Sequence, residues 1–533
     1  MIDKTFSYFR VNLSRCWLIL GLFLGVWGAK LQVLQTYSVD IPFEDEWHAD
    51  AMNLFKPWEE GTLKISDFFT PHNEHRIVFT RLWDLGWYIL NGQWSPQLLM
   101  ITNAATHSLL AVVWFLLLGQ SLSKTGKLAF LVITGVLIAL PYSTATALAA
   151  FQSQFYFLLL FSTLGIWLMT AFPPFIPAWW GGMGLMICAF FSVSSGLLGF
   201  LTVAFGFVLK YLRDRQLKRS EWYAAGLLVG IFGVGYLLRT EVPNHEQLLT
   251  TSAEAFLKSF SMALAWPQVN TVALSAIYYA PFLLLNSLYV LRRIPYTPTV
   301  VFLLSSGWWI IMNVGASAYL RGGAGEPPAV RYWDILLMGV ILNAACLLYI
   351  PRINGRFSRD RAPAGPRSDK HTPRKPLKPQ KEKRPATAYV SVGIVLLGTI
   401  WFFSTGYGLY QQGTLLYSRM LPAKLQQQTF AMQHIKDFLS TKNREHLTGK
   451  GVKQTSFSGN PDEFAALLSD PTVQKLLPPE INPISALKTW LTRLGLSCMA
   501  MGLPIMLVGL LCIGIGTFKS DTSKVSSMDK RKP

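Results

Sequence analysis

Long apolar runs alternate with short polar segments along most of the chain. A run of about 20 apolar residues can cross the hydrocarbon core of a bilayer as a helix. Such runs predict about twelve membrane-spanning helices, near 16–36, 97–119, 128–146, 154–172, 178–194, 196–212, 221–238, 270–291, 298–316, 333–350, 388–410 and 490–516. The fold class is therefore an all-α polytopic membrane protein. Residues 178–212 form either two spans or a re-entrant pair, because Ser192–Gly196 interrupts the apolar run.

The composition agrees with this fold class. Hydrophobic residues make up 51% of the chain and charged residues 14%, and the mean hydropathy is +0.32, which excludes a soluble globule of 533 residues. The net charge of +19 comes from lysines and arginines gathered between the apolar runs. Positive charge in short loops marks the cytoplasmic side, so we expect a cytoplasmic amino terminus and no nucleic-acid partner.

These patterns divide the chain into a membrane module and a late extracytoplasmic domain. Residues 1–350 form the transmembrane module, whose first extracytoplasmic loop covers 37–96. Residues 351–387 are basic and rich in proline, which predicts a disordered cytoplasmic linker. The last two spans, within 388–516, enclose a small helical extracytoplasmic domain at 411–488, and 517–533 form a cytoplasmic tail.

The first loop opens with an acidic run, Glu44-Asp45-Glu46, followed by Trp47. Carboxylates clustered just outside a bilayer are candidates for chemistry rather than for packing. A carboxylate can take the proton of an attacking hydroxyl group, so Asp45 is the first candidate for a general base, ahead of Glu46 and Glu44.

The same loop contains the segment His72-Asn-Glu74-His75-Arg76. Thr70 before Pro71 predicts the start of an interfacial helix that runs to about Leu90, with His72, Arg76, Thr80 and Asp84 on one face. Solvated loop charges on a membrane-surface helix would give a similar pattern. A divalent metal ion held by Asp45, His72 and His75 remains open as a cofactor, although the spacing is not that of the zinc motif His-Glu-x-x-His.

A second extracytoplasmic loop carries Arg321 and, at its end, Arg331-Tyr332. Two arginines on the translocated side oppose the usual charge bias of membrane loops. Guanidinium groups bind phosphate in a bidentate manner, so these residues predict a phosphate site at the membrane surface.

The layout of the chain resembles the GT-C class of integral membrane glycosyltransferases. The resemblance covers most of the chain and depends on Asp45-Glu46-Trp47, on His72-Asn-Glu74-His75-Arg76 and on Arg331-Tyr332. It implies transfer of a sugar from a polyprenyl-phosphate carrier to an extracytoplasmic glycan, lipid or protein. Asp45 then matches the loop carboxylate of the class. Arg76, Arg321 and Arg331 would bind phosphate, with His72, Glu74, His75 and Tyr332 beside them.

The expected location is the bacterial cytoplasmic membrane, with the active site facing outside the cytoplasm. Three alternatives remain open. A multi-pass transporter or lipid flippase would place ionisable residues near the middle of the bilayer. A transferase resembling the O-antigen ligases would use Arg419, His434 and His446 of the late loop. A membrane scaffold would have no reaction.

Overall fold

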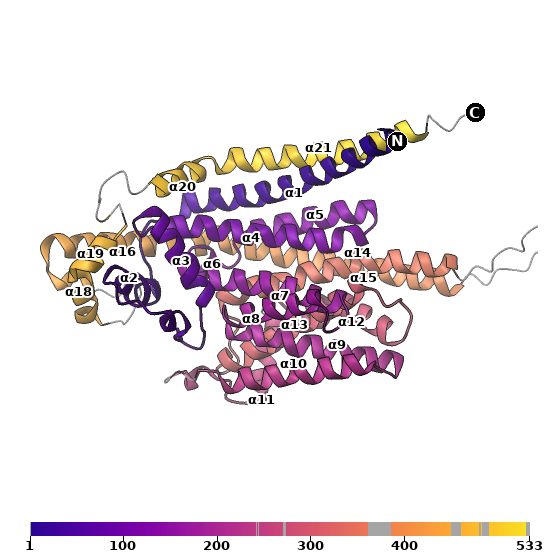
Figure 1. The fold of residues 1–533 in the computed structure, drawn as a ribbon, viewed down its shortest axis with the longest axis horizontal. Coiled ribbons are helices and arrows are strands. Elements are labelled where there is room, and N and C mark those ends of the chain that lie inside the picture. Colours follow the sequence, from indigo (N-terminus) through magenta and orange to yellow (C-terminus); the bar gives the residue numbers. More distant parts are fainter. Residues whose placement is uncertain are drawn as a thin grey trace, which may run out of the picture.

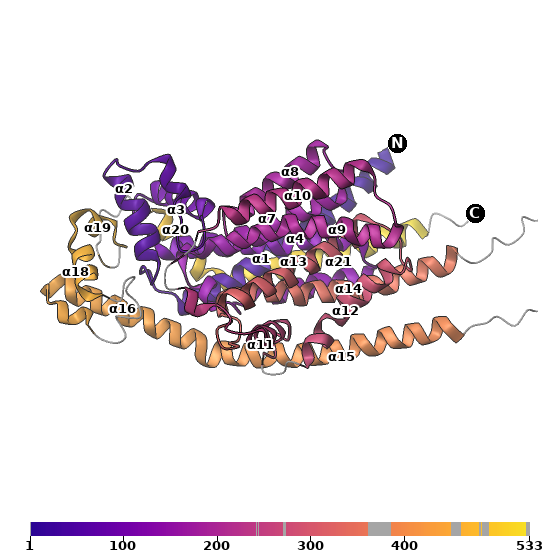
Figure 2. The same cartoon turned by 90° about the horizontal axis from the view of Figure 1, so that it is seen from below.

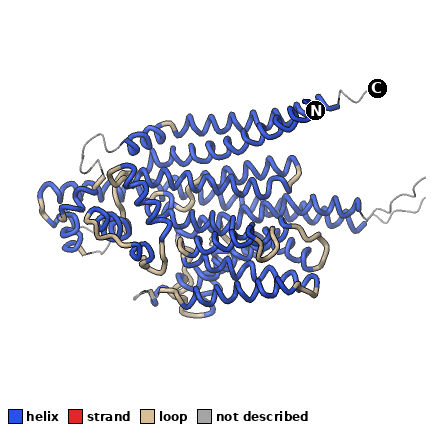
Figure 3. Tube along the Cα trace, viewed as in Figure 1, coloured by secondary structure: helices blue, strands red, loops and turns tan. Residues whose placement is uncertain are grey.

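The computed structural model describes residues 2–240, 242, 245–269, 273–360, 385–448, 460–478, 481 and 490–528. These residues form helices and loops, and no strand is present among them (Figure 3). An isolated bridge between His72 and His75 is the one β-type pairing recorded for this part of the chain. The all-α fold class is therefore confirmed.

Long, roughly parallel helices form an elongated bundle (Figure 1). The bundle consists of α1 (Ile2–Tyr37), α4 (Pro96–Leu118), α5 (Lys124–Ala139), α7 (Ser153–Ala171), α8 (Pro177–Phe190), α9 (Leu198–Asp214), α10 (Arg219–Leu237), α12 (Leu274–Val290), α13 (Pro298–Arg321), α14 (Trp333–Asp360), α15 (Pro385–Leu415), α20 (Trp490–Ala500) and α21 (Gly502–Met528). The remaining helices are α2 (Lys56–Glu59), α3 (Val78–Asn91), α6 (Thr144–Ala147), α11 (Ala253–Leu264), α16 (Leu421–Thr441), α18 (Pro461–Ser469) and α19 (Pro471–Leu476).

Within the described residues, seven helices are long and apolar enough to cross a membrane, or eight if α20 and α21 form one span bent by 63°. The count of twelve is not confirmed. The segments predicted at 128–146, 178–194 and 270–291 correspond to α5, α8 and α12, which have only 16, 14 and 17 residues. The structure resolves 178–212 into two antiparallel helices, α8 and α9, joined by a short turn that includes Ser194–Leu197.

One further expectation requires correction, and another concerns a segment that lies mostly outside the described residues. The helix predicted from Thr70 begins at Val78 instead, because His72 and His75 exchange backbone hydrogen bonds in a tight turn and Asn73 is left-handed at φ 49°. His72 and Arg76 therefore do not share a helix face with Asp84. The linker predicted at 351–387 is helical up to Asp360 and again from Pro385, and its remainder lies outside the described residues.

The late helices pack on the first loop at one end of the bundle. Figures 1 and 2 both place α16, α18 and α19 at the same end as α2 and α3. The Nζ atom of Lys56 lies 2.5 Å from the Oδ2 atom of Asp470, and the rings of Trp47 and Phe464 meet edge to face at 5.2 Å. The segment from α16 to α19, called here the late region, thus packs on the first loop. Helix α16 continues from α15 through a π-helical turn at Leu416–Met420.

The first and last long helices pack closely because glycines line their interface. Both views show α1 beside α21 (Figures 1 and 2). A Cβ atom added at Gly28 would lie 2.3 Å from the backbone nitrogen of Met506, and one at Gly509 would lie 2.3 Å from that of Gly25. Small residues allow such backbone contact between membrane helices, where apolar burial alone gives no preference for protein over lipid.

We therefore predict that Gly28→Ala destabilises the protein by about 1–3 kcal/mol, the usual cost of overpacking. Gly25→Ala is the matched control on the same helix, because a Cβ atom there meets nothing within 4 Å. Thermal unfolding of the detergent-purified protein measures both variants. Equal unfolding temperatures for the two variants would contradict the close packing of α1 on α21.

Candidate functional site

The three carboxylates of the acidic run have different environments. Glu46 is fully buried and accepts hydrogen bonds from the backbone nitrogens of Ala150, at 2.6 Å, and Phe43, at 3.1 Å. Burial raises the pKa of Glu46 well above its ordinary value. The Glu44 side chain is 55% exposed and lies 3.5 Å from the Nζ atom of Lys424. Glu46 thus anchors the loop, and Glu44 contacts the late region.

Asp45 is the member of the run that remains accessible and charged. Its side chain is 44% exposed, and its Oδ2 atom lies 4.0 Å from the Nε2 atom of His72. The interaction with His72 is the largest cause of a lowered pKa at Asp45; burial opposes it, and the positive charge of Arg331 adds to it. The carboxylate therefore lies beside an imidazole and within electrostatic reach of a guanidinium group.

Glu74 joins the first loop to three distant segments. Its carboxylate accepts a hydrogen bond from Arg321 at the end of α13 and lies 2.5 Å from the Nδ1 atom of His245. Its backbone carbonyl accepts a hydrogen bond from the hydroxyl group of Ser194. The first loop and the end of α13 thus meet at Glu74. Sequence reasoning missed the role of His245 and Ser194, although His245 lies in the polar stretch 244–247 and Ser194 lies in Ser192–Gly196.

Most of the remaining candidate site residues contact other parts of the protein, and Arg331 differs from them. Arg76 donates a hydrogen bond to the carbonyl of Phe69 at 2.7 Å, and burial lowers the pKa of His75 to about 4, which keeps its ring neutral. Arg331 is exposed and forms no hydrogen bond or ion pair with any described residue. Its neighbour Tyr332 packs edge to face on Phe155, with ring centroids 6.0 Å apart. Arg331 is therefore the guanidinium available to a ligand near Asp45.

The metal-binding alternative gains no support from the geometry. In the described part of the chain, no three His, Cys, Asp or Glu side chains are placed to hold a metal ion. Asp45, His72 and His75 are therefore not gathered into one coordination site. The ring of His75 instead contacts the Ser194 hydroxyl group, with 3.3 Å between Nδ1 and Oγ.

A cluster of buried ionisable residues adjoins the acidic run. Asp50, on the π-helix Trp47–Phe55, and Asp84, on α3, are both fully buried, and neither carboxylate has a hydrogen-bond partner among the described residues. Arg81 is also buried and donates to the carbonyls of Asp67, Phe68 and Thr70. Burial raises the pKa of Asp50 to about 8, and the positive charge of Arg81 opposes this rise. In the sequence, only the i, i+4 spacing of Glu46 and Asp50 indicated that these two acidic side chains lie close together.

A second group of polar side chains is buried among the long helices. Lys30 on α1, His107 on α4 and Asp334 on α14 are each at most 5% exposed. Asp334 accepts a hydrogen bond of 2.7 Å from the hydroxyl group of Thr146, and His107 stacks on Tyr156 with ring centroids 4.4 Å apart. Neither ring nitrogen of His107 has a hydrogen-bond partner among the described residues. The sequence showed these residues as single polar positions within apolar runs.

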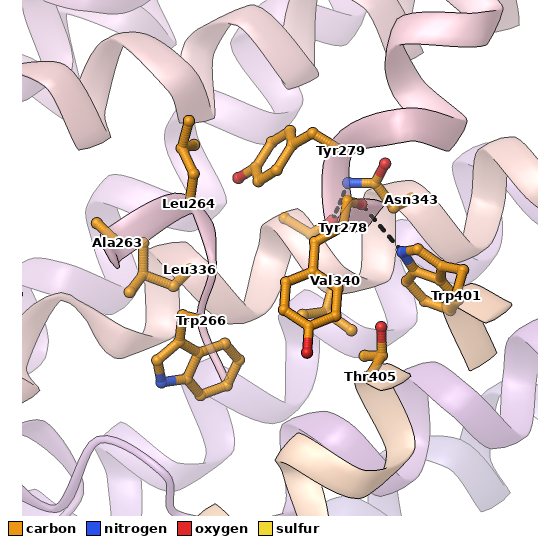
Figure 4. A pocket seen from close by; sticks show the side chains of 11 residues that line it. Ala263, Leu264, Trp266, Tyr278, Tyr279, Leu336, Val340, Asn343, Trp401 and Thr405 are labelled. Carbon is orange, nitrogen blue, oxygen red and sulfur yellow. Dashed lines mark hydrogen bonds between the residues drawn. The ribbon is translucent and has the colours of Figure 1, made fainter. Parts of the chain in front are cut away.

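Two further polar regions, around His434 and around Trp401, stabilise the packing of helices. The Nδ1 atom of His434 lies 2.7 Å from the carbonyl of His446, which ties α16 to the loop after it. Figure 4 shows a cavity between α11, α12, α14 and α15, where Trp401 donates a hydrogen bond to the carbonyl of Tyr278 at 2.9 Å. Its volume of about 10 Å³ admits at most a water molecule, and no charged side chain lines it.

No protein-family model, curated protein or solved structure matches this chain. The site is therefore interpreted from its own residues.

We predict that the protein loses stability as the pH rises from about 6 to about 8, and that Asp50→Asn reduces this loss. Because the folded-state pKa of Asp50 is raised to about 8, the folded state retains a proton that the unfolded chain releases near pH 4. The unfolding free energy therefore falls across this interval. Glu46 and Asp84 act in the same direction.

Thermal unfolding of the purified protein at both pH values provides the measurement. Asp462→Asn is a suitable control, because this side chain is 63% exposed. A wild-type protein that gains stability with rising pH, or an Asp50→Asn variant with undiminished pH dependence, would contradict the assignment.

Proposed function

We propose that this protein is an inverting membrane glycosyltransferase that uses a polyprenyl-phosphate-linked sugar. The observation that carries the proposal is an accessible carboxylate, Asp45, within electrostatic reach of Arg331, whose guanidinium group pairs with no described residue, at one end of a bundle of apolar helices. The acceptor would be a cell-envelope glycan, lipid or protein. The site would face outside the cytoplasm of a bacterial inner membrane, a side supported by the distribution of basic loops.

The reaction assigns a separate role to each group. The acceptor oxygen attacks the anomeric carbon, and the bond from that carbon to the phosphate oxygen breaks with its electron pair on the phosphate. Asp45 accepts a hydrogen bond from the attacking hydroxyl group and takes its proton as the new bond forms. Arg331 stabilises the negative charge of the departing polyprenyl phosphate. Glu74 acts as a positioning residue, because it holds Arg321 and thereby the loop that leads to Arg331.

Asp45→Asn should lower the rate of sugar transfer by about 100-fold or more, the usual contribution of a positioned base. Glu44→Gln is the matched control from the same run; its exposed ion pair contributes little, so we expect a rate within about threefold of wild type. The assay measures labelled sugar transferred by the purified, folded variants. Near-normal transfer by Asp45→Asn would remove the proposed base.

Arg331→Gln should raise the KM for the lipid donor by about tenfold or more, because one charge-assisted hydrogen bond to phosphate is lost. Arg444→Gln removes the same charge from a side chain that is 66% exposed in the late region and serves as the control. Initial rates at varied donor concentration give the KM of each variant. An unchanged KM in Arg331→Gln would eliminate the phosphate role.

A transporter is the second candidate function, and the buried Lys30, His107 and Asp334 favour it. Lys30 lies seven residues before the end of α1, about 10 Å along the helix axis. Ionisable residues at such depth are frequent in transporters. A proteoliposome assay separates the two functions, because a transporter moves a lipid or solute without forming a glycosidic product.

A further inference from the structure

A polar cleft lies at the end of the bundle opposite Asp45. Helix α9 connects the two ends: its preceding turn contains Ser194, which bonds to Glu74, and it runs to Asp214, about 30 Å away at 1.5 Å per residue. The cleft has a volume of about 580 Å³ and lies between the ends of α9, α10 and α12. Its charged lining residues are Lys210, Arg213, Asp214, Lys218, Glu221 and Arg292.

The cleft carries an excess of positive charge. Four of these residues are basic and two are acidic, and the two acids are already engaged. Glu221 pairs with Lys210, and the Oδ1 atom of Asp214 lies 3.4 Å from the Nε atom of Arg213. Lys218 and Arg292 are exposed and form no ion pair with another described residue. Two cationic groups therefore remain available to an anion.

The arginine at the base of the cleft is held in place by its neighbours. The Arg213 guanidinium group lies over the ring of Tyr289, at 4.7 Å from the centroid, and the Arg213 side chain is only 12% exposed. Its Nε and Nη1 atoms have no hydrogen-bond acceptor among the described residues. Arg292 donates a hydrogen bond to the carbonyl of Arg213, which joins the end of α12 to that of α9. A cationic site whose side chains are already held in place requires little further ordering when an anion binds.

Exposed apolar side chains border the cleft on the helices that form it. Tyr211 and Leu212 on α9 are each 40% exposed, and Trp222 on α10 is 56% exposed. The rings of Tyr211 and Trp222 lie 6.0 Å apart. Aromatic residues gather where lipid tails meet headgroups, and in that position these rings would bring the cleft to the level of the phosphates. The loops at 210–219 and 292–293 are also those that the positive-inside rule assigns to the cytoplasm, where anionic lipids are concentrated.

We propose that this cleft binds the phosphate group of an anionic phospholipid. The lipid tails would lie along α9 and α10, and the phosphate would contact Arg292 and Lys218 above Arg213. A soluble phosphate shares the charge but gains nothing from the apolar border. The proposal does not depend on the proposed glycosyl transfer, because it concerns the other end of the bundle.

The test uses the full-length protein in a neutral detergent. Native mass spectrometry counts retained phosphatidylglycerol, with phosphatidylcholine as the zwitterionic comparison and inorganic phosphate as a separate competitor. We expect wild type to retain phosphatidylglycerol about tenfold better than phosphatidylcholine. Lys218→Gln/Arg292→Gln should lower this retention about tenfold, the size of one charge-assisted hydrogen bond. The single Lys218→Gln variant should lower phosphatidylglycerol retention less. It also keeps the hydrogen bond from Arg292 to the end of α9, so a loss of retention in this variant does not arise from a change in helix packing.

Arg444→Gln is the matched control, because it removes one positive charge from the opposite end and should retain lipid as wild type does. Equal retention by the double variant and wild type would overturn the site. Displacement of the lipid by inorganic phosphate at an equal concentration would instead identify a soluble anion as the ligand and would overturn the lipid assignment.

Discussion

The hydrogen bonds of Glu74 are the constraint on which the organisation of the candidate site depends. One residue of the first loop binds Arg321 and His245 through its carboxylate and Ser194 through its carbonyl. These contacts connect segments up to 247 residues apart in sequence. Because each segment leads directly into a long helix or a tight turn, the ion pair fixes the distance between the first loop and the loop that precedes α14. That distance places Arg331 within electrostatic reach of Asp45.

Burial then gives adjacent acidic residues different properties. Glu46, Asp50 and Asp84 are fully enclosed, so desolvation raises their pKa values and favours the protonated forms. Asp45 lies beside His72 and keeps its charge. An ionised carboxylate can accept a hydrogen bond from a substrate, whereas a buried neutral one supports packing. A lowered pKa also makes Asp45 a weaker base, so its contribution to transfer depends strongly on its position relative to the acceptor hydroxyl group.

The sequence predicted the features that depend on local periodicity. Apolar runs identified the long helices, and two polar loops indicated where side chains would gather. The start of α3 was missed because Thr70-Pro71 is a good helix-start signal. Arg81, however, donates hydrogen bonds to the carbonyls of Asp67, Phe68 and Thr70 and holds this stretch outside the helix. His245 and Ser194 could not be predicted, because their role arises only from tertiary contact with Glu74. Lys30, His107 and Asp334 were visible as isolated polar residues, but their proximity depends on how α1, α4 and α14 pack.

We propose that this protein moves a sugar from a polyprenyl-phosphate carrier. The most direct test incubates membranes containing the protein, and matched membranes without it, with a panel of radiolabelled polyprenyl-phosphate sugars. We expect at least one sugar to pass to an acceptor only when the protein is present, with release of polyprenyl phosphate. The absence of transfer from every donor in the panel would contradict it.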